Sequence, residues 1–130
     1  MASPSEAGQY ELELMNWAAR IGSQAKLDGI AKSQIEQLIG SAELIPEHAP
    51  LITAAFAHRQ AERLKKGHNT ARVISQAMKW LYQEKRDKNE VRKLLGLAKW
   101  VFECVENQYI REQFKTFEDL VKSLAEEKRR

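Results

Sequence analysis

Histidine and cysteine are the side chains of this sequence whose chemistry most often serves catalysis or metal binding. The three histidines, His48, His58 and His68, are ten residues apart, and this spacing does not place two of them on one face of a helix as metal ligands. Cys104 stands in an apolar stretch and is expected to be a buried, unreactive thiol. The six glycines are isolated, so the sequence has no glycine-rich phosphate loop. We therefore expect no catalytic site, no metal site, no cofactor and no enzyme activity.

Basic side chains, in contrast, are concentrated in the middle of the sequence. Residues 1–56 contain three basic and seven acidic side chains, residues 57–95 eleven and four, and residues 96–130 seven of each. The three parts therefore carry −4, +7 and 0, which gives the net charge of +3. A basic region of this kind is a candidate surface for a polyanion. The alternative is that these lysines and arginines only keep two helices solvated.

The elements that would position these cations are helices, because apolar residues recur at helical spacing along nearly the whole chain. We predict an all-α fold, a compact bundle of five to six short helices, in one domain spanning residues 1–130, with residues 126–130 as a frayed charged tail. The helices are expected to begin near Ser5, Ser33, Pro50, Asn69 or Thr70, Asp87 and Thr116.

Turn and capping signals set the expected boundaries of these helices. The first helix is expected to end near Ser23, with a turn over Ala25–Ile30, and Gly67 to stop the third. Ser33 with Glu36 and Asp87 with Glu90 have the spacing of a capping box.

Every expected helix has an apolar side. The expected buried residues are Leu12, Met15 and Ala19 with Leu14, Ala18 and Ile21 in the first helix, Val91, Leu94, Leu95, Ala98, Val101, Phe102 and Val105 in the fifth, and Phe117, Leu120, Val121 and Leu124 in the sixth.

The basic side chains fall on these helices and on the turns between them. Arg59, Arg63 and Lys66 recur at helical spacing and are expected to share one face of the third helix. The basic turns at 65–72 and 85–93 would lie at opposite ends of the fourth helix, so we expect a basic stripe along it. Such a stripe suits an extended row of phosphates. The candidate RNA-binding residues are Arg59, Arg63, Lys65, Lys66, Arg72, Lys79, Arg92 and Lys93.

Tryptophan and tyrosine side chains near this stripe could stack on bases. Trp80 and Tyr82 flank the inward Leu81, and Trp100 stands beside Val101. The alternative, which we favour from the sequence, is that these rings cover the edge of the core or anchor a partner protein.

Three segments of the sequence resemble the small all-helical subunit of type III CRISPR effector complexes, the Csm-type small subunit. They are the Ser-Gln-Ile segment within Leu27–Leu38, the Phe56-containing helix Ile52–Arg63, and Val91–Gln108 with its Trp-Val-Phe-Glu motif. They stand in the order found in the family and cover about half of the chain. The chain departs from the family pattern in having no glycine–arginine pair after the aromatic residue and in its last helix, from Thr116.

This resemblance implies a structural, non-catalytic role in an RNA-guided antiviral defence complex. Family members lie beside the backbone subunits that hold guide RNA, contact the guide RNA–target RNA duplex, and adjoin the large polymerase-like subunit and further copies of themselves. Arg59 and Arg63 fall in a matched segment, whereas the other six candidate residues depend on the charge pattern alone.

Two other classes of function remain open from the sequence. The chain could be a helical protein–protein adaptor with no role in nucleic-acid binding, or a DNA-binding regulator. A helix-turn-helix in the second and third helices is disfavoured because the connection between them is long and contains proline.

The sequence also bears on the compartment. The first fifteen residues contain three glutamates and no basic side chain, and the longest run without Asp, Glu, Lys or Arg is the eleven residues His48–His58. We therefore expect neither a signal peptide nor a membrane-spanning helix. A single cysteine cannot form an intramolecular disulfide. We expect a cytoplasmic ribonucleoprotein subunit that does not bind membranes.

Overall fold

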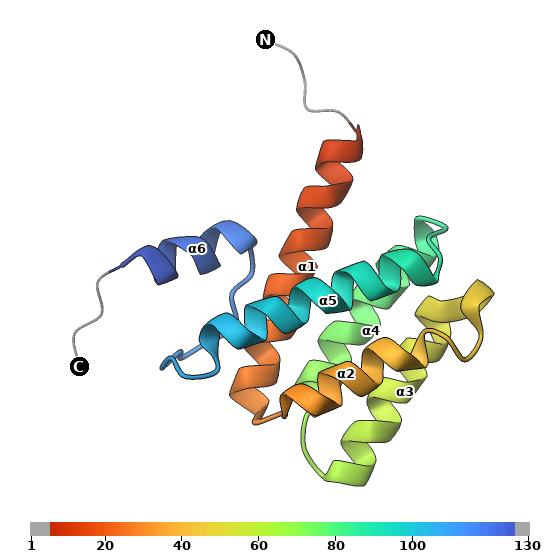
Figure 1. Cartoon of the computed structure of the whole chain (residues 1–130), viewed down its shortest axis with the longest axis horizontal. Helices are drawn as coiled ribbons and strands as arrows, with labels where there is room; N and C mark the ends of the chain where they lie inside the picture. Colours follow the sequence, from red (N-terminus) through yellow and green to blue (C-terminus); the bar gives the residue numbers. More distant parts are fainter. Residues whose placement is uncertain (1–5, 127–130) are drawn as a thin grey trace.

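The computed structural model describes residues 6–126, and this part of the chain is all-helical, as predicted. The described residues form six α-helices and one short 3-10 helix (η1), with no β-strand, and the α-helices are labelled in Figure 1. Their bounds are α1 Glu6–Asp28, α2 Lys32–Ser41, η1 Pro46–His48, α3 Ala49–Leu64, α4 His68–Gln83, α5 Lys88–Val105 and α6 Phe117–Ala125. Ser5, where we expected the first helix to begin, and residues 127–130 of the predicted tail lie outside the described residues.

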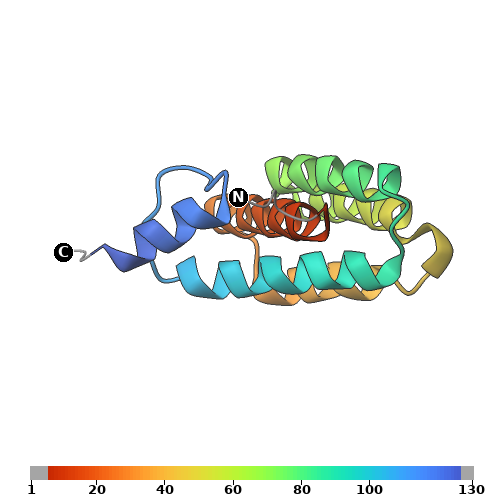
Figure 2. The ribbon, with the colours of Figure 1, turned by 90° about the horizontal axis from the view of Figure 1, so that it is seen from above.

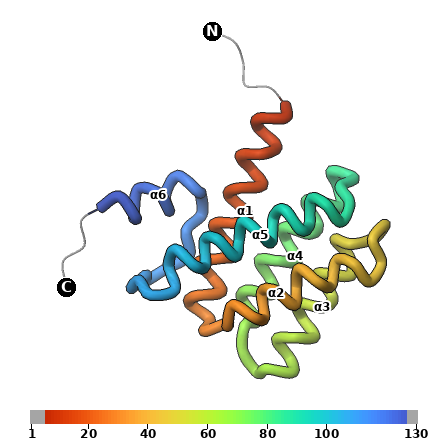
Figure 3. Tube along the Cα trace, viewed as in Figure 1, coloured from red at the N-terminus to blue at the C-terminus, as the bar shows by residue number. Residues whose placement is uncertain are grey.

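The helices are arranged in layers around α1. Figure 2 shows α3 and α4 side by side on one side of the molecule, α2 and α5 on the opposite side, and α1 between them. The most extensive contacts of α1 are with α5 and α4, one helix from each side. The tube in Figure 3 also shows that the N-terminal half of α1 projects past the other helices and that α6 is set apart from the main bundle.

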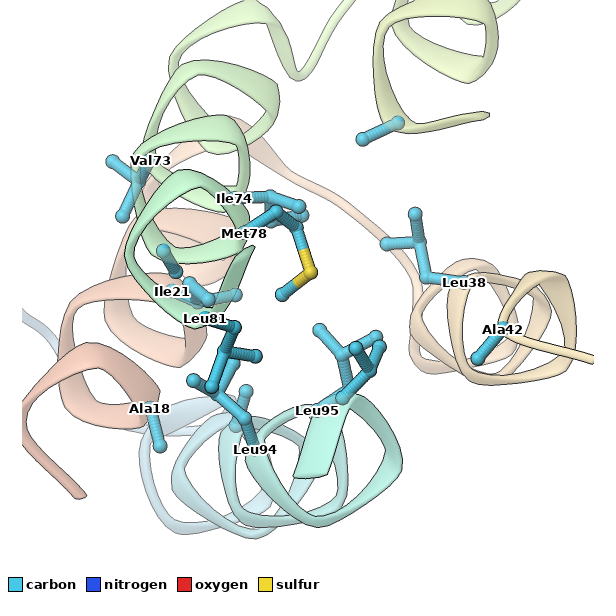
Figure 4. Close-up of a cluster of buried hydrophobic side chains, with 14 of the residues drawn as sticks. Ala18, Ile21, Leu38, Ala42, Val73, Ile74, Met78, Leu81, Leu94 and Leu95 are labelled. Carbon is cyan, nitrogen blue, oxygen red and sulfur yellow. The ribbon is translucent and has the colours of Figure 1, made fainter. Parts of the chain in front are cut away.

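The hydrophobic core lies where these layers meet. Figure 4 shows Leu94 and Leu95 of α5 opposite Met78 and Leu81 of α4, with side chains of α1 and α2 closing the sides. All seven residues expected to be buried in the fifth helix are buried. The expectation for the first helix is wrong at Leu12, which is 55% exposed because it lies on nearly the opposite side of α1 from the fully buried Leu14.

The end of α1 differs from the prediction. The helix continues to Asp28, and only Gly29 and Ile30 form the predicted turn. Gly29 has a φ of 73°, and the amides of Gly29 and Ile30 donate to the carbonyls of Lys26 and Ala25. This is a Schellman motif, in which a residue with positive φ ends the helix and is most often glycine.

Two predicted N-terminal caps are also different in the structure. α2 begins after Ala31, whose amide donates to the Gln34 side chain at 2.9 Å, so Ser33 and Glu36 do not form a capping box. α4 begins at His68, and its free amides are capped from another helix. The Asp28 carboxylate accepts from the amide and hydroxyl of Thr70, at 2.8 and 2.7 Å. This cap ties the end of α1 to the start of α4.

The caps predicted for the last two helices are partly correct. Asp87 caps α5 through the amide of Asn89, but Glu90 does not complete a box and instead accepts from Tyr10. Thr116 caps α6, as expected. The predicted apolar face of α6 is buried only at Leu120, because α6 packs against a small part of α1 and α5.

Candidate nucleic-acid interface

Six of the eight candidate cations lie on one helical hairpin. Arg59 and Arg63 are on α3, Lys65 and Lys66 follow its last residue, and the remaining two are on α4. All six are exposed. The prediction that Lys66 shares a helical face with Arg59 is wrong. α3 ends at Leu64, and Lys65, in a left-handed conformation, turns the chain before Lys66. We call the outer surface of residues 49–83 the α3–α4 face.

The two α4 cations provide the part of the predicted stripe that lies on a single helix. Arg72 and Lys79 are seven residues apart, so they point to the same side of α4 one above the other. Both are exposed, whereas α4 buries Ile74, Ala77 and Met78 on its opposite side. The hairpin therefore carries cations at its turn and along α4.

None of these six cations has a carboxylate partner within 4.0 Å in the described part of the chain. Residues 49–83 contain one acidic side chain, Glu62. Its carboxylate lies 2.8 Å from His68 Nε2, and this hydrogen bond, with the nearby charge of Lys65, holds the pKa of Glu62 below its usual value. The α3–α4 face is therefore a surface of one sign, with its one carboxylate already engaged.

The other two candidate residues are in a different electrostatic environment. Arg92 pairs with Glu43 at 3.1 Å and Lys93 with Glu11 at 3.3 Å. Both cations are on α5, in the layer opposite α4. The structure therefore does not bring Arg92 and Lys93 together with the other six, and an anion that binds them must compete with carboxylates of the same chain.

Trp80 and Arg86, both within the basic region 57–95, pack on the ring of Tyr10. The ring of Tyr10 stacks on Trp80 with centroids 5.1 Å apart, and the guanidinium of Arg86 lies 3.9 Å from the Tyr10 centroid. The Tyr10 hydroxyl donates to Glu90 at 2.7 Å. Trp80 thus covers the edge of the core, as the favoured alternative predicted, and Arg86 is held on a ring. No local sequence signal predicts this cluster, because Tyr10 and Trp80 are far apart in the chain.

The chemistry of this cluster affects the ionisation of the tyrosine. Burial of the Tyr10 hydroxyl, its hydrogen bond to Glu90 and the negative charge of that carboxylate raise the pKa of Tyr10 well above its usual value of 10.0. Tyr10 therefore stays protonated, and its hydroxyl donates a hydrogen bond to the Glu90 carboxylate. The cluster joins the N-terminal half of α1 to the turn between α4 and α5.

The prediction that Cys104 is buried is wrong. The thiol is exposed, because α5 turns Val101 and Val105 inward and Cys104 falls on the outer side of the helix. Trp100, four residues earlier, shares this outer side and is 67% exposed. Neither side chain is near the α3–α4 face, since α5 lies in the opposite layer.

Two lysines are held in a backbone conformation that usually selects glycine. Lys65, after α3, has a φ of 60°, and Lys85, after α4, has a φ of 57°. A left-handed conformation costs a residue with a Cβ about 1–2 kcal/mol. The Lys85 turn has the same two hydrogen bonds as the Gly29 turn, from Lys85 and Arg86 to Tyr82 and Leu81. The chain therefore carries a cation at both ends of α4 where glycine would be less strained.

The described residues contain neither a metal-binding cluster nor a membrane-spanning helix. In residues 6–126 no group of three or more His, Cys, Asp or Glu side chains could hold a metal ion. Over the same residues no helix has the length and apolar character needed to cross a bilayer. The chain was also compared with protein-family models, with curated proteins and with solved structures, and none of them matches it.

Proposed function

We propose that this chain is the non-catalytic small subunit of a type III CRISPR interference complex, acts in the cytoplasm, and contacts guide and target RNA through the α3–α4 face. The observation that supports this proposal is the set of six cations on that face without a carboxylate partner. The three segments that resemble the family fall on the α1–α2 junction, on α3 and on α5. The remaining surfaces contact the backbone subunits, the large polymerase-like subunit and neighbouring copies.

The α3–α4 face binds phosphates by charge and not by reading bases. α4 has sixteen residues and is therefore about 24 Å long, so its cations can follow several nucleotides of a backbone. Each lysine or arginine that neutralises a phosphate releases condensed counterions, which makes the affinity fall steeply with salt. Because lysines and arginines of this kind contact phosphate oxygens, the binding does not depend on nucleotide sequence.

Fluorescence anisotropy with labelled RNA, measured over a range of salt concentrations, tests the RNA-binding role. Arg72→Gln with Lys79→Gln should weaken binding and reduce the slope of log affinity against log salt by about 2, roughly 1 for each phosphate contact. The matched control is Arg92→Gln with Lys93→Gln, which removes two cations already paired with carboxylates and should have a smaller effect. Equal losses in both double variants, or no RNA binding at low salt, would overturn the role of the α3–α4 face.

Co-purification tests the assembly. The chain is co-expressed with a type III backbone subunit and guide RNA, and the complex is isolated through a tag on the backbone subunit. We expect the chain in the complex, and we expect Arg59→Glu with Arg63→Glu to reduce its amount while the thermal melt stays that of the wild type. A chain that binds RNA but never enters the complex would contradict the CRISPR assignment and leave the RNA-binding role standing.

A protein–protein adaptor is the second candidate, and the exposed apolar side of α6 favours it. Val121 and Leu124 are 51% and 41% exposed, although they are on the same face as the buried Leu120. An adaptor needs this surface and not the α3–α4 cations. In that case Val121→Gln with Leu124→Gln would abolish capture of the partner, and removal of Arg72 and Lys79 would leave capture unchanged.

A further inference from the structure

A groove runs along the side of α3 that faces α2. Its wider part, of about 420 Å³, is lined by α2 residues around Gly40 and by Phe56, Arg59 and Arg63. A second hollow of about 310 Å³ continues it toward the start of α3. Leu44, Phe56 and Arg59 line both parts, so the two form one groove. Both parts are shallow and open to solvent, so a ligand bound there would keep one side exposed.

The α2–α3 groove combines cationic and apolar side chains. The wider part has Arg59 and Arg63, which are one helical turn apart and have no carboxylate partner in the described residues. Leu44, which is 65% exposed, and Phe56 line both parts, and Ile52 adds to the apolar lining of the second hollow. The groove therefore offers a flat apolar surface directly beside two guanidinium groups, which themselves can stack on a planar ring.

Gly40 keeps the wider part of the groove open. It is the next-to-last residue of α2. A Cβ at Gly40 would meet no atom within 4 Å, so no packing contact of this chain requires glycine there. Because Gly40 lines the groove, any larger side chain would extend into the space that a ligand can occupy.

The surroundings of the groove favour RNA over an acidic peptide as its occupant. A peptide helix with carboxylates could pair with Arg59 and Arg63, but it would leave Lys65, Lys66 and the two cations of α4 unmatched. The phosphate backbone of an RNA strand can continue from the groove onto those cations. The phosphates of a duplex could contact the arginines, but its bases are stacked inside the helix and could not reach the apolar surface of Phe56 and Leu44. A single strand can place an unstacked base on the apolar surface.

We propose that the α2–α3 groove binds one unpaired base of single-stranded RNA, with Arg59 and Arg63 on the phosphates beside that base. This inference rests on the proposed RNA-binding function and adds a preference for single strands to it. The base lies against Phe56 and Leu44, and the backbone continues onto the cations of the α3–α4 face. The site thus distinguishes an unpaired segment of RNA from a continuous duplex.

Filling the groove is the sharpest test. Gly40→Leu places an apolar side chain in the wider part, and Gly96→Leu is its matched control. Gly96 is also helical and open, with no atom within 4 Å of an added Cβ, but it is on α5. Anisotropy is measured with a labelled single-stranded RNA and with the same strand annealed to its complement. We expect Gly40→Leu to weaken single-strand binding by about fivefold to a hundredfold, the range for loss of one stacked base, and to leave duplex binding unchanged.

Each other outcome has a definite meaning. Wild-type affinity of Gly40→Leu for the single strand, or an equal loss for the duplex or in Gly96→Leu, overturns the base site and leaves the cationic α3–α4 face intact. No RNA binding by the wild type overturns the proposed function and the base site together. A leucine–glutamate amphipathic peptide that binds the wild type but not Gly40→Leu, while single-strand binding is the same for both, assigns the groove to a protein and overturns the proposal. Thermal melts of both leucine variants, which we expect to match that of the wild type, check that they are folded.

Discussion

The two outer layers of the bundle contain similar numbers of basic side chains and use them differently. Five are on α2 and α5, and each pairs with a carboxylate of another element, for example Lys99 with Glu36 at 2.8 Å and Lys32 with Glu103 at 3.4 Å. We call this surface the α2–α5 face. Six are on the α3–α4 face, and none of them has such a partner among the described residues.

The difference shows that charge density along a sequence does not identify a binding surface by itself. On the α2–α5 face each cation joins its helix to a carboxylate elsewhere in the same chain, which reduces the positive field of this face. On the α3–α4 face it is not cancelled and acts on the solvent, where it can attract a polyanion. The assignment of Arg92 and Lys93 to the candidate site from sequence could not take this into account, because Glu43 and Glu11 are far from them in the chain.

The largest expected effect tests the core that holds both faces in place. Leu95 is fully buried between the two outer layers. Leu95→Ala should lower the free energy of unfolding by about 2–5 kcal/mol, since it removes apolar contacts and leaves a cavity. Urea denaturation followed by circular dichroism measures the change. A loss below about 0.5 kcal/mol, the level of an ordinary surface substitution, would show that the layers do not meet at Leu95.

A smaller effect is expected at the cluster of Tyr10, Trp80, Arg86 and Glu90. Tyr10→Phe should cost about 1–2 kcal/mol, because it deletes a hydrogen bond to the charged Glu90. The raised pKa of Tyr10 means that the folded protein keeps a proton that the unfolded chain loses above pH 10.0. Wild-type stability therefore falls as the pH rises through that value, and the difference from Tyr10→Phe should narrow. Urea midpoints on either side of it measure this. A constant difference would mean that the pKa of Tyr10 is not raised in the folded protein.

The third prediction separates charge from conformation on the α3–α4 face. Lys65→Gly should relieve the positive φ and raise stability by about 0.5–1 kcal/mol, after allowance for the greater freedom of glycine in the unfolded chain. It should also weaken RNA binding, because a free cation is lost. Lys85→Gly is the matched control and should give the same gain in stability with a smaller change in RNA affinity. Anisotropy and thermal melts on both variants decide this, and an unchanged affinity for Lys65→Gly would remove Lys65 from the interface.

The fold could be predicted from the sequence wherever the pattern was local and repeated. α5 has seven apolar residues at helical spacing, and every one of them is buried. Predictions failed where the decisive contact came from elsewhere in the chain. The first turn of α4 is capped by Asp28 of α1, and not by Asn69 or Thr70 as the local sequence suggested. A cap from a distant residue leaves no signal among its neighbours in the sequence. The exposure of Cys104 depends on which side of α5 the other helices cover, and a short apolar stretch does not contain that information.

The sequence showed which part of the chain is most basic but not which basic residues are free of carboxylate partners. The excess of basic residues over 57–95 falls mainly on the α3–α4 hairpin. The sequence did not indicate which cations are free, because ion pairing is a property of the packed helices. The α2–α3 groove was missed altogether. Gly40 is the next-to-last residue of α2, and its local sequence does not show that it lies in an open position beside Arg59.

The smallest expected effect concerns an ion pair of the α2–α5 face. The hydrogen bond and charge of Lys99 lower the pKa of Glu36 below its usual 4.5. The folded protein therefore binds fewer protons than the unfolded chain in this range, and the resulting stability is present above pH 4.5 and lost as the pH falls through the lowered pKa. Lys99→Gln should be slightly less stable than the wild type at neutral pH and equal to it in acid. Arg59→Gln, on the α3–α4 face, has no carboxylate partner and should show no such convergence. Urea midpoints at both pH values measure the two differences, and identical behaviour of the two variants would mean that the faces do not differ in ion pairing.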